Sequence, residues 1–146
     1  MKKICLLMTI IVLISLLSGC STTCYWEFNH SYEDIVEIKI IDLDGVGFLP
    51  TKDDFTVIKE LDISQAKELY DDIACLQMQR GGLNPVDPGG NSFLIVFANG
   101  EFDIISIVGS THCKFDEDGV LTSYVSFLYS NEEAFSQLVS KYLSVS

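Results

Sequence analysis

Two strands are predicted near the start of the folded part of the chain by alternating apolar and polar residues. Within residues 35–43 the apolar side chains recur at every second position, which is the period of a half-buried strand. The residues expected on the buried side are Val36, Ile38 and Ile40, and those expected on the exposed side are Glu37 and Lys39. A shorter strand is predicted over 55–61, after a loop rich in glycine.

Two helices are predicted by apolar residues at spacings of three and four. The first begins at Asp62, which has the spacing of a capping box with Gln65, and the second follows a similar pair, Ser130 and Glu133. The apolar stripe of the first helix comprises Ile63, Ala66, Leu69, Tyr70, Ile73 and Leu76, and that of the second comprises Phe135, Leu138, Val139 and Tyr142. At about 100° per residue, Cys75 lies on the polar side of the first helix.

The strongest local signal is a hairpin over 93–108, with Asn99 and Gly100 at its turn. This dipeptide accepts the positive φ angles that a two-residue type I′ turn requires. Counting outward from the turn pairs Phe97 with Phe102 and Ile95 with Ile104 on the expected core face, and Val96 with Asp103 and Ala98 with Glu101 on the other. A second hairpin is predicted over 111–129, turning at 116–119.

The predicted order is strand, strand, helix, four strands, helix. This order favours an α+β fold, a single small domain with a mainly antiparallel sheet of about five to six strands and two helices packed on one face. We assign residues 32–146 to this domain. Because such layered folds host unrelated activities, the architecture does not name a function.

The first 19 residues have the arrangement of a secretory signal peptide. Lys2 and Lys3 precede an apolar stretch over 4–17, and small residues follow it at Ser18 and Gly19. The apolar stretch would extend about 21 Å as a helix, which is shorter than the ~30 Å hydrocarbon core of a bilayer. We therefore expect this segment to direct export. An uncleaved membrane anchor is the alternative.

The end of this segment, Leu17-Ser18-Gly19-Cys20, resembles the lipobox of bacterial lipoproteins at all four positions. The resemblance implies that the Cys20 thiol receives a diacylglyceryl group and that cleavage between Gly19 and Cys20 makes Cys20 the new N-terminus. Two acyl chains hold a protein at a membrane far more firmly than one. We expect a lipid-anchored protein that faces outside the cytoplasm, with residues 20–31 as a short spacer that folds partly onto the domain through Tyr25, Trp26 and Phe28.

The exported part is strongly acidic, which excludes some partners. The whole chain has 21 Asp and Glu residues against nine Lys and Arg, and its formal charge is −12. Two of the nine are Lys2 and Lys3, so the exported part has a formal charge of −14 from 21 acidic and seven basic residues. Nucleic acid needs a basic face, so we expect no nucleic-acid partner. An unidentified protein or small molecule is the expected ligand.

The cysteines and histidines form no recognisable catalytic motif. Cys24, Cys75 and Cys113 remain after Cys20 is acylated, so a monomer can form at most one bridge. We consider a bridge between Cys75 and Cys113, with unpaired thiols as the alternative. A cysteine nucleophile needs a base, and His112 is adjacent to Cys113, but consecutive strand residues point to opposite faces.

Grouped carboxylates leave two other hypotheses open. An enzyme could use Asp42, Asp44, Asp53 and Asp54, and calcium could bind the same oxygens. The spacing matches an EF-hand loop only in part, since Val46 and Asp53 occupy positions that need other ligands. Solvated turn residues are the simpler interpretation of this cluster and of 116–118. We predict no catalytic set, no metal site and no cofactor.

Overall fold

The computed structural model describes residues 23–25, 28, 30–44, 55–79, 89–108, 111–126 and 132–144. The sequence predictions for the signal peptide, Cys20, Trp26, Asp53, Asp54 and Ser130 concern residues outside these ranges. No helix within the described part is both long and apolar enough to cross a membrane.

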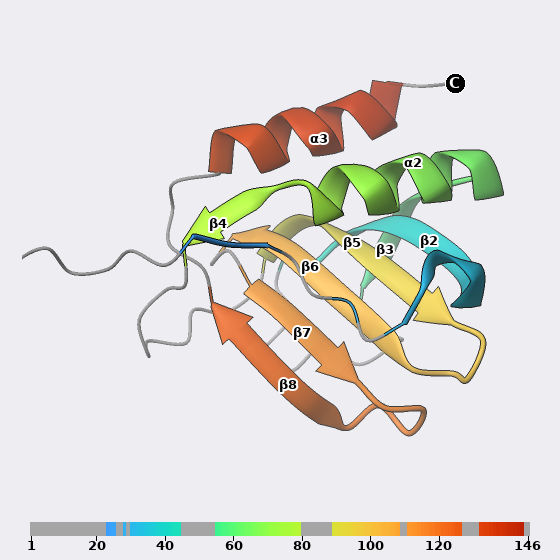
Figure 1. Cartoon of the computed structure of the whole chain (residues 1–146). Helices are drawn as coiled ribbons and strands as arrows, with labels where there is room; N and C mark the ends of the chain where they lie inside the picture. Colours follow the sequence, from blue (N-terminus) through green and yellow to red (C-terminus); the bar gives the residue numbers. More distant parts are fainter. Residues whose placement is uncertain are drawn as a thin grey trace, which may run out of the picture.

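The described residues form a six-stranded antiparallel sheet with two helices on one face, which confirms the predicted α+β fold (Figure 1). The strand order is β3-β2-β5-β6-β7-β8. These strands are β2 (Ile35–Asp42), β3 (Thr56–Glu60), β5 (Gly89–Phe97), β6 (Phe102–Val108), β7 (Thr111–Phe115) and β8 (Leu121–Ser126). The helices are α2 (Ile63–Ala74) and α3 (Glu132–Ser144), and a 3-10 helix, η1 (Tyr32–Asp34), precedes β2.

A separate two-stranded sheet, which the sequence analysis did not predict, joins the spacer to the domain. β1 (Thr23–Tyr25) pairs antiparallel with β4 (Gln77–Gln79), which follows the C-terminal end of α2. Thr23 lies opposite Gln79, and Tyr25 lies opposite Gln77. The described part of the predicted spacer is therefore attached to the folded domain.

Both faces of the main sheet are buried. The face toward the helices carries apolar side chains that pack against the stripes of α2 and α3, and it comprises Ile38, Ile40, Phe93, Ile95, Phe97 and Ile105. The opposite face carries a second apolar cluster, which comprises Ile41, Leu43, Leu94, Phe102, Ile104, Cys113 and Phe115. Burial on both sides explains why residues 93–97 of β5 and 104–105 of β6 are apolar at consecutive positions.

The predicted capping box at Asp62 is present. The Asp62 carboxylate accepts hydrogen bonds from the backbone amides of Ser64 and Gln65, both at 2.9 Å, and the Gln65 side chain accepts the Asp62 amide at 3.2 Å. These bonds satisfy donors that the first turn of a helix leaves without partners. The Ser64 hydroxyl also donates to the Asp62 carboxylate, at 2.6 Å, and this bond, with the two amide bonds, lowers the pKa of the Asp62 carboxyl. The apolar stripe is confirmed at Ala66, Leu69 and Ile73, whereas Ile63 is 60% exposed.

We expect Asp62→Ala to lower the thermal midpoint by about 3 to 6 °C, because a small domain is sensitive to the loss of one N-cap. Asp62→Asn is the matched control, since its side-chain oxygen can accept the same two amides. The midpoints are measured by circular dichroism. Equal losses in the two variants would show that the carboxylate charge, and not the cap, matters.

The two helices are joined by a polar cluster on their outer side. Lys141 of α3 donates to Glu68 and to Asp72 of α2, each at 2.7 Å, and the Tyr142 hydroxyl donates to Asp72 at 2.9 Å. Tyr142 is itself buried beneath this contact. The cluster therefore fixes how α3 lies along α2.

The predicted register of the first hairpin is wrong by one residue. The loop has three residues, Ala98, Asn99 and Gly100, and the Gly100 amide donates to the Phe97 carbonyl while the Phe97 amide donates to Glu101. Gly100 has φ of 89°, which favours glycine at the third loop position. The shift pairs Val96 with Phe102, Ile95 with Asp103 and Leu94 with Ile104. Phe102 and Ile104 therefore lie on the face away from the helices, and Asp103 lies on the helix-facing side.

Two further differences come from local irregularities in strand pairing. The register between β2 and β5 shifts between Ile35 and Glu37, so Ile35 is buried and Val36, predicted to be buried, is 59% exposed. A second shift lies in β2 between Ile40 and Ile41, opposite Lys59 and Val57 of the edge strand β3. The hairpin of β7 and β8 turns at 116–119 as predicted, with Gly119 at φ of 80°.

Candidate functional site

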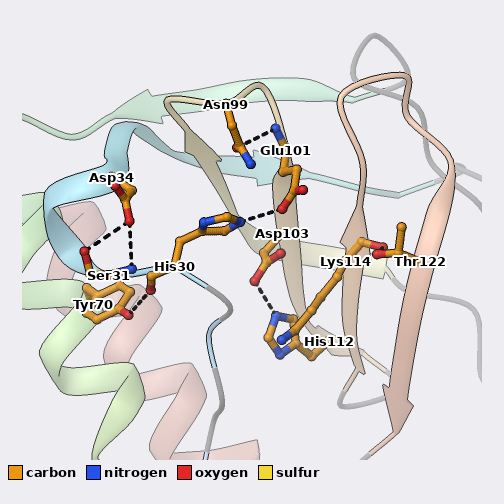
Figure 2. A network of polar contacts seen from close by, with 10 residues as sticks. All are labelled: His30, Ser31, Asp34, Tyr70, Asn99, Glu101, Asp103, His112, Lys114 and Thr122. Carbon is orange, nitrogen blue, oxygen red and sulfur yellow. Dashed lines mark hydrogen bonds and ion pairs between the residues drawn. The ribbon is translucent and has the colours of Figure 1, made fainter.

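Phe28 and His30, which precede β2, contact the sheet and α2, and His30 is drawn in Figure 2. The Phe28 ring stacks on the Tyr70 ring of α2 with 4.4 Å between the centroids, and its centroid lies 5.8 Å from that of His112. The Tyr70 hydroxyl donates to the His30 carbonyl at 2.7 Å. The expectation that the spacer folds partly onto the domain through Phe28 is confirmed.

His30 fastens the same segment to the first hairpin. Its Nε2 atom lies 2.5 Å from Oε2 of Glu101, and its ring lies 4.5 Å from the Phe97 ring, measured between centroids. The hydrogen bond with His30 lowers the pKa of the Glu101 carboxyl. The His30–Glu101 pair therefore joins two parts of the chain that are far apart in the sequence, the residues before β2 and the first hairpin (Figure 2).

A second pair of this kind lies deeper, between β6 and β7. His112 Nε2 lies 2.8 Å from Oδ2 of Asp103, and the two side chains are only 2% and 4% exposed. Lys114 lies opposite Asp103 across the two strands, and Figure 2 draws it with this pair. A buried carboxylate is costly without a partner, so this hydrogen bond is what allows Asp103 to lie on the helix-facing side of the sheet.

A carboxylate bonded to a histidine also occurs in nucleophile triads, but here Cys113 does not supply the nucleophile. Cys113 lies in the apolar cluster on the opposite face of the sheet, as the strand alternation predicted. Burial raises the pKa of the Cys113 thiol to about 12, which keeps it protonated at neutral pH. The pair therefore serves chiefly to hold β6 and β7 together beneath Phe28.

The raised pKa of Cys113 predicts a pH dependence of stability. A thiol that ionises near 9 in the unfolded chain and near 12 when folded stabilises the fold fully below pH 9, and this contribution is lost between the two values. From pH 8 to pH 10 we expect the wild-type free energy of unfolding to fall by about 1.4 kcal/mol relative to that of Cys113→Ala. Urea titrations at both pH values test this. A constant difference between the two proteins would contradict it.

The bridge considered between Cys75 and Cys113 is not formed. Both thiols are free: Cys75 is exposed after the last residue of α2, and Cys113 is buried. The helices cover one face of the sheet, whereas the Cys113 side chain belongs to the cluster on the other. The sheet itself therefore separates the two thiols.

Carboxylates of both acidic groups, where they are described, accept backbone amides in turns or at the start of β5. Asp42 accepts the Asp44 amide and Asp44 accepts the Gly90 amide, both at 2.9 Å. Asp116 accepts the amides of Asp118 and Val120 at 3.1 and 2.8 Å. Within the described ranges, no group of three or more His, Cys, Asp or Glu side chains is placed to hold a metal ion.

The Asp103–His112 pair was not predicted from the sequence, because a two-residue turn places Asp103 on the wrong face of the sheet. The predicted two-residue turn set Asp103 opposite Val96, where a solvated carboxylate needs no partner. A signal was available: Asp103 is the one charged residue of β6, whose other residues are apolar apart from Ser106, and a charged residue in such a strand implies a buried partner. His112, in the next strand, was considered only as a base for Cys113.

Comparison of this chain with models of protein families, with curated proteins and with solved structures finds no match.

Proposed function

We propose that this protein is a lipoprotein whose acidic domain is held at the outer face of the cytoplasmic membrane and acts there as a non-catalytic binding domain. The observation that carries the proposal is the attachment of the spacer to the domain. β1 begins three residues after Cys20, and it is hydrogen-bonded to β4. A chain acylated at Cys20 would therefore carry its folded domain directly on the anchor, without a long stalk.

The described ionisable groups that could carry chemistry support a binding role over a catalytic one. His30, Asp103 and His112 are each engaged in a hydrogen bond with another side chain of the same chain. Asp42, Asp44 and Asp116 accept backbone amides. These groups stabilise the fold. The surface of the domain is therefore the part that is available to bind a partner.

Lipidation is tested by expressing the protein and Cys20→Ser in a bacterium fed an alkyne-bearing fatty acid. We expect the wild type to take up the label and to sediment with membranes, and Cys20→Ser to do neither. Cys24→Ser is the matched control, because it removes a neighbouring thiol and should keep the label. An intact mass that shows an unmodified amino terminus in the wild type would overturn the proposal.

The binding role is tested by crosslinking in intact cells and recovery of the protein from detergent-solubilised envelope. We expect a defined partner to be recovered with the wild type and lost with Cys20→Ser, because the soluble form leaves the membrane surface. Recovery of no partner under any crosslinking condition would count against a binding role.

A further inference from the structure

We infer that the contact between residues 30–34 and the first hairpin is a pH-dependent latch, which closes more tightly when His30 is protonated. The latch comprises His30 and η1 on one side and residues 97–101 on the other. The inference goes beyond the proposed function. It does not depend on the acylation of Cys20, because every group of the latch lies in the described part of the domain.

The latch is held at the turn of the hairpin by one titratable contact and one backbone contact. His30 Nε2 lies 2.5 Å from Oε2 of Glu101, and the His30 ring packs on the Phe97 ring. Beside this pair, the Ala98 amide donates to the Asp34 carbonyl at 2.8 Å. The backbone bond itself does not titrate, whereas the strength of the His30–Glu101 pair depends on its charges. The Ala98 amide therefore reports whether the latch is closed.

The other side of the same segment is fixed to α2. The Tyr70 hydroxyl donates to the His30 carbonyl at 2.7 Å, and the Tyr32 hydroxyl donates to the Ile63 carbonyl at 3.4 Å. Burial raises the pKa of the Tyr70 hydroxyl above its ordinary value of 10.0, so the Tyr70 bond is unchanged near neutral pH. Opening of the latch therefore separates the segment from the hairpin, while the bond to α2 remains.

Carboxylates outnumber lysines among the charged groups that face the latch. Glu101 and Asp103 are two residues apart, so their side chains share one side of the hairpin, and Figure 2 shows both on the side where His30 lies. The titratable and charged groups around the latch are Asp34 of η1, Lys67 and Tyr70 of α2, Glu101 and Asp103 of the first hairpin, His112 and Lys114 of β7, and Asp116 and Glu117 of the second turn. A positive charge on His30 is therefore added to a predominantly negative surface.

His30 is the member of the His30–Glu101 pair that changes charge near neutral pH. The hydrogen bond with His30 lowers the pKa of the Glu101 carboxyl, so Glu101 stays ionised between pH 5 and 8. Histidine side chains change charge within this range. A neutral imidazole forms an ordinary hydrogen bond with a carboxylate, whereas an imidazolium forms a charge-assisted one, which is about twice as strong. The latch therefore tightens as the pH falls and loosens as the pH rises.

The partial exposure of the pair sets the size of the effect. The side chains of His30 and Glu101 are 21% and 37% exposed, so solvent screens the attraction between them. Ion pairs at such positions change an equilibrium by about two- to fivefold. We therefore expect the latch to open about two- to fivefold less often at pH 5.5 than at pH 8.

The test measures amide hydrogen exchange by NMR in the full-length protein in detergent, at pH 5.5 and pH 8, with each rate corrected for the intrinsic exchange rate at that pH. Exchange at Ala98 requires its bond to the Asp34 carbonyl to open. The control is the Leu43 amide, which donates to the Gly90 carbonyl at 3.2 Å, beyond the opposite end of β2. We expect the protection of Ala98 to be about two- to fivefold greater at pH 5.5, and that of Leu43 to be equal at both pH values.

Two variants assign the effect to the pair. Glu101→Gln and His30→Gln each remove one charge and keep a side chain that forms neutral hydrogen bonds, so we expect Ala98 protection in both to be independent of pH. Equal Ala98 protection at the two pH values in the wild type would overturn the inference. A pH dependence that persists in Glu101→Gln would also overturn it, since another group such as His112 would then be responsible. So would an equal change at Ala98 and Leu43, which would mean that the whole fold responds to pH.

Discussion

Replacement of His112 by alanine is expected to lower the free energy of unfolding by about 3 to 5 kcal/mol, because it leaves the buried Asp103 carboxylate without its partner. The two side chains are 2% and 4% exposed and lie 2.8 Å apart, so solvent cannot replace the lost hydrogen bond. Loss of His112 also removes the ring beneath Phe28, which loosens the spacer. Urea denaturation at pH 7 measures the effect.

The matched control removes both charges together. Asp103→Leu combined with His112→Leu leaves no unpaired buried charge, so we expect it to recover most of the stability lost in His112→Ala. The double-mutant cycle then gives the coupling energy between the two side chains. A loss below about 1 kcal/mol for His112→Ala would contradict the assigned role, since it would mean that Asp103 finds another partner.

Replacement of Phe93 by alanine is expected to cost about 3 to 5 kcal/mol of stability, because it opens a cavity between the sheet and α3. Phe93 is fully buried, and its ring lies 5.3 Å from the Phe135 ring, measured between centroids. The surrounding strand and helix are held by the rest of the core, so they can collapse only in part. Chemical denaturation of the purified domain gives the value.

Ile63→Ala is the matched control for Phe93→Ala. Ile63 is also an apolar residue, but it is 60% exposed at the start of α2, so the change should stay within about 0.5 kcal/mol. Similar losses in the two variants would mean that the core lies elsewhere. A thermal scan of both proteins under the same conditions provides a second measure.

The elements that the sequence predicts well are those with one apolar face. α2 and α3 each bury one stripe, so their period of 3.6 residues is visible, and Asp62 marks the start of α2 through its own chemistry. The order and number of the main strands followed from the same reasoning. The backbone pairing of β1 with β4 left no such pattern, because each strand has three residues.

The register of the first hairpin could not be predicted for the opposite reason. Phe93 to Phe97 and Ile104 to Ile105 are apolar at every position, because both faces of the sheet are covered. A shift by one residue then changes which apolar side chain faces which core without changing the amount of apolar surface buried. The turn decided the register, and with it the placement of Asp103 beside His112.

The irregular edge of β3 has a consequence for crowding. If the protein is anchored as proposed, many copies share one surface, and an open strand edge invites pairing into aggregates. β3 exposes Val57 and Ile58, but the shift in its pairing with β2 interrupts the regular row of donors and acceptors. Lys59 of the same strand is bonded to the Tyr142 carbonyl at 2.7 Å. A distorted edge that carries lysine is a poor template for a neighbouring copy, which favours a dispersed, monomeric population at high surface density.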